Sequence, residues 1–261
     1  MKNFFRQILK TILGVLTKAI IRKHKMYLII ITGWYGSSIV RELIYHLLKS
    51  NFNVRRNTNS IWWDLSIPLV ILGYEDKKRN YFEWIILVFK IIFSFLTKPN
   101  YHHKIILNLD TLNDRTADFW VKYLKPQICV ILNENPRSKL LKRILLNKEY
   151  KDTLFVYNKD VFRELEKYTL RRYVYSQKHG DLLFKKIDNV LVVKSRKVKI
   201  KIKISNTYNF IWEFIPAAIS VALIEKMPLK QINSNIIQFN LHPYQYKAVF
   251  AHLKRFIISD E

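Results

Sequence analysis

The stretch that decides the fold runs from residue 26 to residue 38 and reads MYLIIITGWYGSS. Met26 to Thr32 form a continuous apolar run rich in β-branched residues, which is typical of a parallel strand buried on both faces. Gly33 to Ser38 then predict a turn, and residues 39–49 have the periodicity of a helix. A strand, a glycine-containing turn and a helix together bring backbone N–H groups and the positive helix end to a place where an anion can bind.

Short apolar strands and helices continue to alternate after this unit. The predicted strands are residues 105–109, 128–132 and 154–157, and the predicted helices are residues 114–124, 160–168 and 212–226. Strands that alternate with helices indicate a mostly parallel sheet with right-handed crossovers. The expected fold class is therefore α/β, with a mostly parallel sheet flanked by helices.

A different pattern begins near residue 190. Residues 190–193 and 198–204 flank Lys194-Ser195-Arg196, and residues 197–204 (KVKIKIKI) alternate strictly between basic and apolar. Strict alternation predicts a half-exposed antiparallel hairpin. Its lysines face either solvent or an anionic partner.

Residues 2–25 (KNFFRQILKTILGVLTKAIIRKHK) predict a basic amphipathic helix. Such a helix can lie in a membrane interface or against a partner, and it can equally pack on its own domain. The block at residues 84–96 (WIILVFKIIFSFL) predicts a buried or surface-lying helix, because 13 residues are too few to span a bilayer core. We expect neither a membrane-spanning helix nor a signal peptide.

The composition is strongly basic, with 45 Lys and Arg against 20 Asp and Glu, a formal charge of +25 over 261 residues. Such a charge favours anionic partners, either nucleic acid or an anionic membrane surface. Arg171-Arg172 and residues 194–203 could contact phosphates, with Tyr173 and Tyr175 stacking on bases. Only one cysteine is present, which excludes a disulfide scaffold and a cysteine-based zinc site.

Three segments in the first half of the chain resemble the central, ATP-binding domain of the Mur ligases, which add amino acids to the peptidoglycan precursor. Residues 31–38 (ITGWYGSS) resemble the I-T-G-x-x-G-K-[ST] loop of that family. Residues 57–72, which end in IPLVIL, resemble its asparagine-rich segment before P-L-x-x-L. Residues 107–110 (LNLD) stand where the family has a strand that ends in a metal-associated Glu.

Three further segments follow in the family's order. Residues 125–133 (KPQICVILN) resemble K-P-D-I-x-V-I-T-N, residues 156–160 (VYNKD) resemble V-x-N-x-D, and residues 216–223 (PAAISVAL) resemble the alanine-rich last helix. The resemblance runs from about Met26 to Asn240. It is nearest to the branch that joins D-alanyl-D-alanine to the UDP-N-acetylmuramoyl-tripeptide, and it implies a P-loop-like Mur ligase central domain.

The resemblance also implies a site that holds ATP and Mg2+. The implied nucleotide-binding residues are Gly33, Trp34, Tyr35, Gly36, Ser37 and Ser38. Ser38 and Asp110 are the implied metal-binding residues, and Asn133, Asn158 and Asp160 are further positions that match the family's motifs.

The chain departs from the family where the chemistry is concentrated. Ser37 stands in place of the loop lysine, whose charge stabilises the transferring phosphoryl group. The family's histidine after Asn133 would fall near Ser138, and its His-Asn pair would fall on residues 210–214, where neither residue matches. Little sequence follows Ser234 to form the family's C-terminal domain. We therefore assign no catalytic residue and expect a degenerate domain, a pseudoenzyme that retains at most nucleotide binding.

Two alternatives stay open. A partner chain could supply the missing ligase domain and complete an ATP-dependent acid–amino-acid ligase, or the chain could be a basic membrane-surface scaffold or a nucleic-acid-binding protein. The expected organisation is a basic helical arm at 1–25, a Mur ligase-like domain at 26–240 and a short helical tail at 241–261. We expect a cytoplasmic protein, with a peripheral position on the inner membrane face as the alternative.

Overall fold

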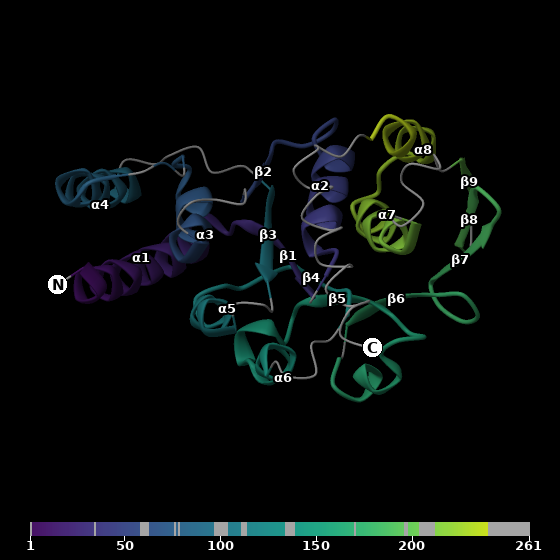
Figure 1. Cartoon of the computed structure of the whole chain (residues 1–261), viewed down its shortest axis with the longest axis horizontal. Coiled ribbons are helices and arrows are strands. Elements are labelled where there is room, and N and C mark those ends of the chain that lie inside the picture. The colour runs from purple at the N-terminus through teal and green to yellow at the C-terminus, as the bar shows by residue number, and fades with distance from the viewer. Residues whose placement is uncertain are drawn as a thin grey trace, which may run out of the picture.

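A computed structural model describes residues 2–33, 35–57, 63–75, 77, 79–96, 104–110, 114–133, 139–169, 171–195, 198–203 and 212–239. The described residues form a single nine-stranded sheet with helices on both faces (Figure 1). The α/β fold class predicted from the sequence is confirmed.

The sheet is parallel over most of its width. Its strands are β1 (Tyr27–Gly33), β2 (Val54–Arg56), β3 (Lys104–Asp110), β4 (Ile128–Ile131), β5 (Leu154–Asn158), β6 (Arg172–Ser176), β7 (Leu182–Ile187), β8 (Val190–Ser195) and β9 (Val198–Lys203). They lie in the order β2-β3-β1-β4-β5-β6-β7-β8-β9. Neighbours from β2 to β7 pair in parallel, while β7, β8 and β9 pair antiparallel.

The helices divide between the two faces. They are α1 (Lys2–His24), α2 (Ser37–Leu48), α3 (Trp63–Leu72), α4 (Tyr81–Leu96), α5 (Asp114–Val121), α6 (Leu140–Leu146), α7 (Ile215–Ile224) and α8 (Leu229–Ile237). One core lies between the sheet and α2, α7 and α8, and a second lies between the sheet and α1, α3, α4, α5 and α6. The sheet therefore separates two hydrophobic cores.

Strand β1 contributes to both cores. Leu28 and Ile30 point into one core while Ile29 and Ile31 point into the other, and all four side chains are fully buried. This double burial is why the strand reads as an uninterrupted apolar run. Because β1 lies between β3 and β4, its carboxyl end opens near the middle of the parallel part of the sheet.

The hairpin predicted after residue 190 is confirmed as β8 and β9. Lys199, Lys201 and Lys203 are exposed, whereas Ile200 and Ile202 between them are buried. Their alternation matches a strand with one face on the core and one in solvent.

The helix predicted at residues 160–168 is wrong. Only Arg163–Lys167 form a short 3-10 helix, and the chain before it turns. The side chain of Asn158 accepts a hydrogen bond from the Asp160 N–H at 3.0 Å, and the Asp160 carboxylate accepts one from the Gln177 N–H at 2.8 Å. These local bonds hold the backbone in a turn, as Asn and Asp commonly do.

The helix predicted at residues 2–25 is confirmed as α1, but it packs on the domain rather than standing apart. Leu13 and Ile20 are fully buried in the same core as Leu28 of β1. Within the described residues, no helix is both long and apolar enough to cross a membrane. The tail predicted at 241–261 lies outside the described residues.

Candidate functional site

The loop between β1 and α2 lies at the carboxyl end of β1. Gly33 pairs with Asp110 of β3, and Gly36 precedes α2 with φ of 78° and ψ of −12°. The Gly36 carbonyl accepts the first helical bond, from the Val40 N–H at 2.9 Å. The N-terminal end of α2 therefore begins directly at this edge of the sheet, an arrangement suited to anions. Trp34 lies outside the described residues.

Asn133, which follows β4, holds this loop through its amide group. Its Oδ1 accepts from the Tyr35 N–H at 3.1 Å, and its Nδ2 donates to the Tyr35 carbonyl at 2.9 Å. A Cβ at Gly33 would lie 3.1 Å from the same Asn133 oxygen, so glycine permits this close approach. The structure thus brings the family-matched Asn133 to the loop, where it positions backbone.

The rings of Phe214 and Tyr35 cover the other side of the loop. They meet edge to face with centroids 5.9 Å apart, and a Cβ at Gly36 would overlap the Phe214 ring. Burial, followed by the nearby charge of Glu213, raises the pKa of the Tyr35 hydroxyl. Two aromatic rings therefore stand where the resemblance to the family would place a His-Asn pair. Nothing in the sequence around Phe214 indicates these contacts, because Phe214 lies 178 positions from Gly36 and 179 positions from Tyr35.

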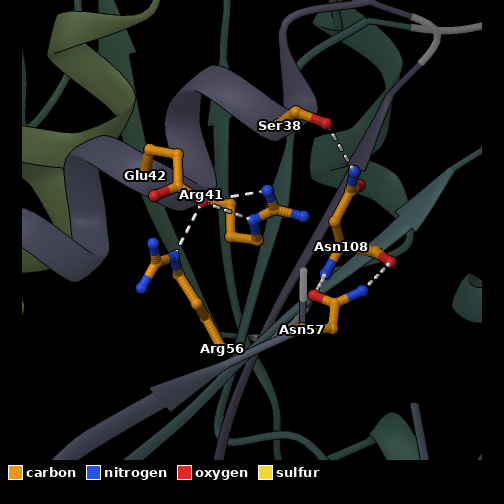
Figure 2. Close-up of polar contacts among 6 residues, drawn as sticks. All are labelled: Ser38, Arg41, Glu42, Arg56, Asn57 and Asn108. Atoms are coloured by element: carbon orange, nitrogen blue, oxygen red, sulfur yellow. Dashed lines mark hydrogen bonds and ion pairs between the residues drawn. The ribbon is translucent and has the colours of Figure 1, made fainter. Parts of the chain in front are cut away.

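Ser38, the predicted metal-binding hydroxyl, belongs to a network of asparagines (Figure 2). Its Oγ accepts from Asn108 Nδ2 at 3.1 Å. Asn57 Oδ1 accepts from the Asn108 N–H at 2.9 Å, and Asn57 Nδ2 donates to the Asn108 carbonyl at 3.3 Å. Sequence reasoning did not assign either asparagine to the site, although the resemblance to an asparagine-rich segment includes Asn57.

The network leaves one acceptor unused. Asn108 Oδ1 is buried, and no hydrogen-bond donor within the described residues reaches it. With the Ser38 hydroxyl it offers oxygen atoms of the kind that Mg2+ prefers. The Asp110 backbone lies beside Gly33, but its side chain is outside the described residues. No cluster of three or more His, Cys, Asp or Glu side chains is found among the residues described.

No basic residue stands between Gly33 and Arg41 in the sequence, and Arg41 is already paired. Arg41 is 2% exposed, and its Nε and Nη2 donate to Glu42 Oε1 at 3.0 and 2.9 Å (Figure 2). Arg56 Nε donates to the same oxygen at 2.8 Å. Burial lowers the pKa of Arg41, and Glu42 opposes that effect. Since a buried charge is costly to unpair, Arg41 is bound in place on α2.

Ser37, which stands at the position of the family's lysine, is 4% exposed. The loop therefore combines a helix N-terminus, a left-handed glycine and a hydroxyl at Ser38 without a lysine. These groups can bind a phosphate through backbone N–H groups, but they lack a side-chain cation for the charge that develops during phosphoryl transfer.

Asn158 and Asp160 lie at the end of β5, two strands away from β1. Asp160 accepts hydrogen bonds from the Ser176 hydroxyl at 3.1 Å and the Gln177 N–H at 2.8 Å. These bonds tie β5 to the end of β6, and the structure does not bring the pair to the β1–α2 loop.

No protein-family model matches the chain, and no curated protein matches its sequence. Its fold does match solved structures. MurF ligase from Thermotoga maritima in complex with ADP superposes with a TM-score of 0.66 at 14% identity, covering 90% of this chain and 53% of that one. MurF from Acinetobacter baumannii gives a TM-score of 0.62 at 15% identity, covering 88% and 50%. MurC from Thermotoga maritima, a UDP-N-acetylmuramate-alanine ligase, gives 0.52 at 14%, covering 85% and 47%.

The chain therefore has a Mur ligase-like fold, as its motifs predicted, and spans about half the length of these ligases.

Proposed function

We propose, from the fold that this chain shares with the Mur ligases, that it is a nucleotide-phosphate-binding domain that does not form an amide bond on its own. The observation that carries the proposal is that the β1–α2 loop has no basic side chain. Ser37 replaces the lysine, and the next basic residue along α2, Arg41, is buried against Glu42.

The geometry supports phosphate binding by backbone. The N-terminal end of α2 presents N–H groups whose partial positive charge favours an anion. Asn133 holds the Tyr35 N–H and carbonyl through two hydrogen bonds, so this part of the loop is positioned before a ligand arrives. ATP, when bound, supplies the phosphoryl group that can activate a carboxylate. Ser38 and Asn108 Oδ1 are the groups that would hold Mg2+ beside it.

The same geometry argues against efficient catalysis. A side-chain donor that stabilises developing charge in the transition state typically contributes about 3–4 kcal/mol. The loop supplies no such cation, because Arg41 donates to Glu42. We propose more widely that the chain acts in or near peptidoglycan-precursor synthesis. A partner chain would then complete an acid–amino-acid ligase. This wider proposal rests on the names of the structural relatives.

The test is calorimetric titration with ATP and Mg2+ of the natural chain and of Ser37→Lys. We expect weak binding by the natural chain and binding at least about tenfold tighter by Ser37→Lys, because a hydrogen bond to a charged group contributes about 1.5–3 kcal/mol. Ser50→Lys is the matched control: it adds the same charge beyond the other end of α2, at an exposed serine, and should leave ATP affinity unchanged.

Two results would contradict the proposal. Tight ATP binding that Ser37→Lys does not improve, accompanied by ligation of a muramoyl peptide, would show that the loop works without a lysine. An absence of binding by both the natural chain and Ser37→Lys would show that the loop is not a phosphate site.

A further inference from the structure

Helices α1 and α4 lie side by side at the end of the molecule opposite the β7–β9 strands (Figure 1). The rings of Phe5 on α1 and Tyr81 on α4 meet edge to face with centroids 4.9 Å apart. Both helices pack against the rest of the chain with one face, so each has a second face that the described residues do not cover.

Helix α4 is apolar on both faces. Trp84, Leu87 and Ile91 are buried against the domain at a spacing of three and four residues. The opposite face exposes Tyr81, Phe82, Ile85, Ile86, Phe89, Ile92 and Phe93. Between Tyr81 and Phe93 only Glu83 and Lys90 are charged. A helix that is apolar all round normally lies inside a protein or in a membrane, not in water.

Helix α1 adds a second exposed stripe. Phe4, Ile8, Ile12 and Val15 are exposed and recur every three or four residues, which places them along one side of the helix. The neighbouring positions Leu9 and Leu13 are buried. We call the exposed apolar residues of the two helices the α1–α4 surface. Exposed apolar residues gathered on two helices that lie side by side mark an interaction site.

The charge of the chain indicates which kind of partner binds the α1–α4 surface. The whole chain has a formal charge of +25, and α1 has six Lys or Arg residues and no acidic residue. Of these six, Lys10 is buried, and Lys18 and Arg22 contact Glu149, so the attraction comes mainly from the charge of the whole chain. A second copy would bring a second charge of +25 to the same contact, and the two would repel. An anionic bilayer accepts apolar side chains and attracts the basic chain at the same time. Lys90, exposed within the apolar face of α4, has an aliphatic stem long enough to reach headgroups.

We propose that the α1–α4 surface lies in the interface of an anionic lipid bilayer, with both helices parallel to the membrane plane. Helix α4 has 16 residues and a span needs about 20, so insertion is shallow. The proposal is independent of nucleotide binding, because the β1–α2 loop lies on a different part of the fold.

The experiment is co-sedimentation of the full chain with vesicles of phosphatidylglycerol and phosphatidylcholine, beside vesicles of phosphatidylcholine alone. Phe89 and Leu146 are both 67% exposed, but only Phe89 belongs to the α1–α4 surface. We expect Phe89→Glu to weaken binding to the anionic vesicles by about tenfold or more, and Leu146→Glu to leave it unchanged. Phe82→Glu, at a position 78% exposed, should repeat the effect of Phe89→Glu.

Melting temperatures of the variants close to that of the natural chain confirm that folding is intact. Equal binding by Phe89→Glu, Phe82→Glu and the natural chain would overturn the proposal, since charge alone would then account for the attraction. A dimer in light scattering that Phe89→Glu dissociates, with no vesicle binding, would overturn it too and assign the surface to a second copy.

Discussion

At Gly36 the backbone turns from β1 into α2 with a positive φ of 78°, and the Phe214 ring fills the space where a Cβ would stand. On the other side of the same loop, the Asn133 amide accepts a hydrogen bond from the Tyr35 N–H and donates one to the Tyr35 carbonyl. The loop is thus shaped by one residue without a side chain and by two side chains from distant parts of the chain. Its conformation depends on all three.

Replacing Gly36 with alanine should lower the free energy of unfolding by about 2–4 kcal/mol, because left-handed strain and overlap with a packed ring add together. In a Phe214→Ala background the added cost of Gly36→Ala should fall to about 1 kcal/mol, the backbone strain alone. Urea denaturation of the natural chain, the two single variants and the double variant measures the coupling between Gly36 and Phe214. The same cost in both backgrounds would show that Phe214 does not pack on Gly36.

Part of this site is predictable from single residues and part is not. The stretch ending at Asn133 stands out as an apolar strand followed by an amide, and the contact with Tyr35 follows once β1 and β4 are neighbours. The link from Ser38 to Asn108 also needs only adjacent parallel strands. The Phe214 contact could not be predicted, because a phenylalanine before an apolar helix has the same pattern whether it covers a loop or fills a core.

Among the elements, α1 has a buried side and a basic side besides its exposed apolar stripe. Its buried side supplies Leu13 and Ile20 to the core, and its basic side reaches Glu149, which accepts from Arg22 at 2.7 Å and lies 3.1 Å from Lys18. The hydrogen bond from Lys18 and the charge of Arg22 hold the pKa of Glu149 below its ordinary value. Glu149 thereby links the helix to the segment after α6.

This link makes part of the stability depend on pH. A carboxyl group whose pKa is lowered by folding stabilises the fold above its unfolded pKa of about 4.3 and loses that effect as pH falls through the folded value. Glu149→Gln should therefore lower the free energy of unfolding by about 0.5–1 kcal/mol at pH 7 and have little effect once pH falls below the folded pKa.

Urea denaturation at several pH values measures this dependence. Glu164→Gln is the control, since Glu164 is 81% exposed and 4.0 Å from Lys167, and it should change little at any pH. A constant difference for Glu149→Gln across all pH values would show that packing, not charge, accounts for the effect.

At the scale of the whole molecule, the sheet divides two cores, and α1 belongs to one of them. Leu13 is fully buried, whereas the adjacent Ile12 is 40% exposed. The two residues have nearly the same volume and polarity, so the sequence could not show which faced the domain. This is also why periodicity predicted the helix but left open whether it packs inward or meets a partner.

The pair Leu13→Ala and Ile12→Ala tests this organisation. Leu13→Ala should lower the free energy of unfolding of the entire domain by about 2–5 kcal/mol, while Ile12→Ala should change it by less than about 1 kcal/mol. Circular dichroism in urea follows the transition. If α1 were an independent arm, Leu13→Ala would leave the main transition where it is.

Most of the sheet could be predicted for one physical reason: strands buried on both faces are uniformly apolar, as in β1 and β4. The strands that were missed are β2, which has only three residues, and β6 and β7, where basic and aromatic residues mix. The wrong helix at residues 160–168 had suitable periodicity. Asp160, at the start of that segment, is held instead by hydrogen bonds to the end of β6, a strand that the prediction did not include.

Strand β9 has a further consequence for solubility. It is the last strand of the described sheet, and such a strand leaves a row of backbone N–H and C=O groups open to pairing. Lys199, Lys201 and Lys203 line its exposed face and place a charge at every second residue. Two such strands brought together would place like charges opposite one another, which is unfavourable. The lysines of the hairpin thereby protect the sheet from growing by addition of another chain.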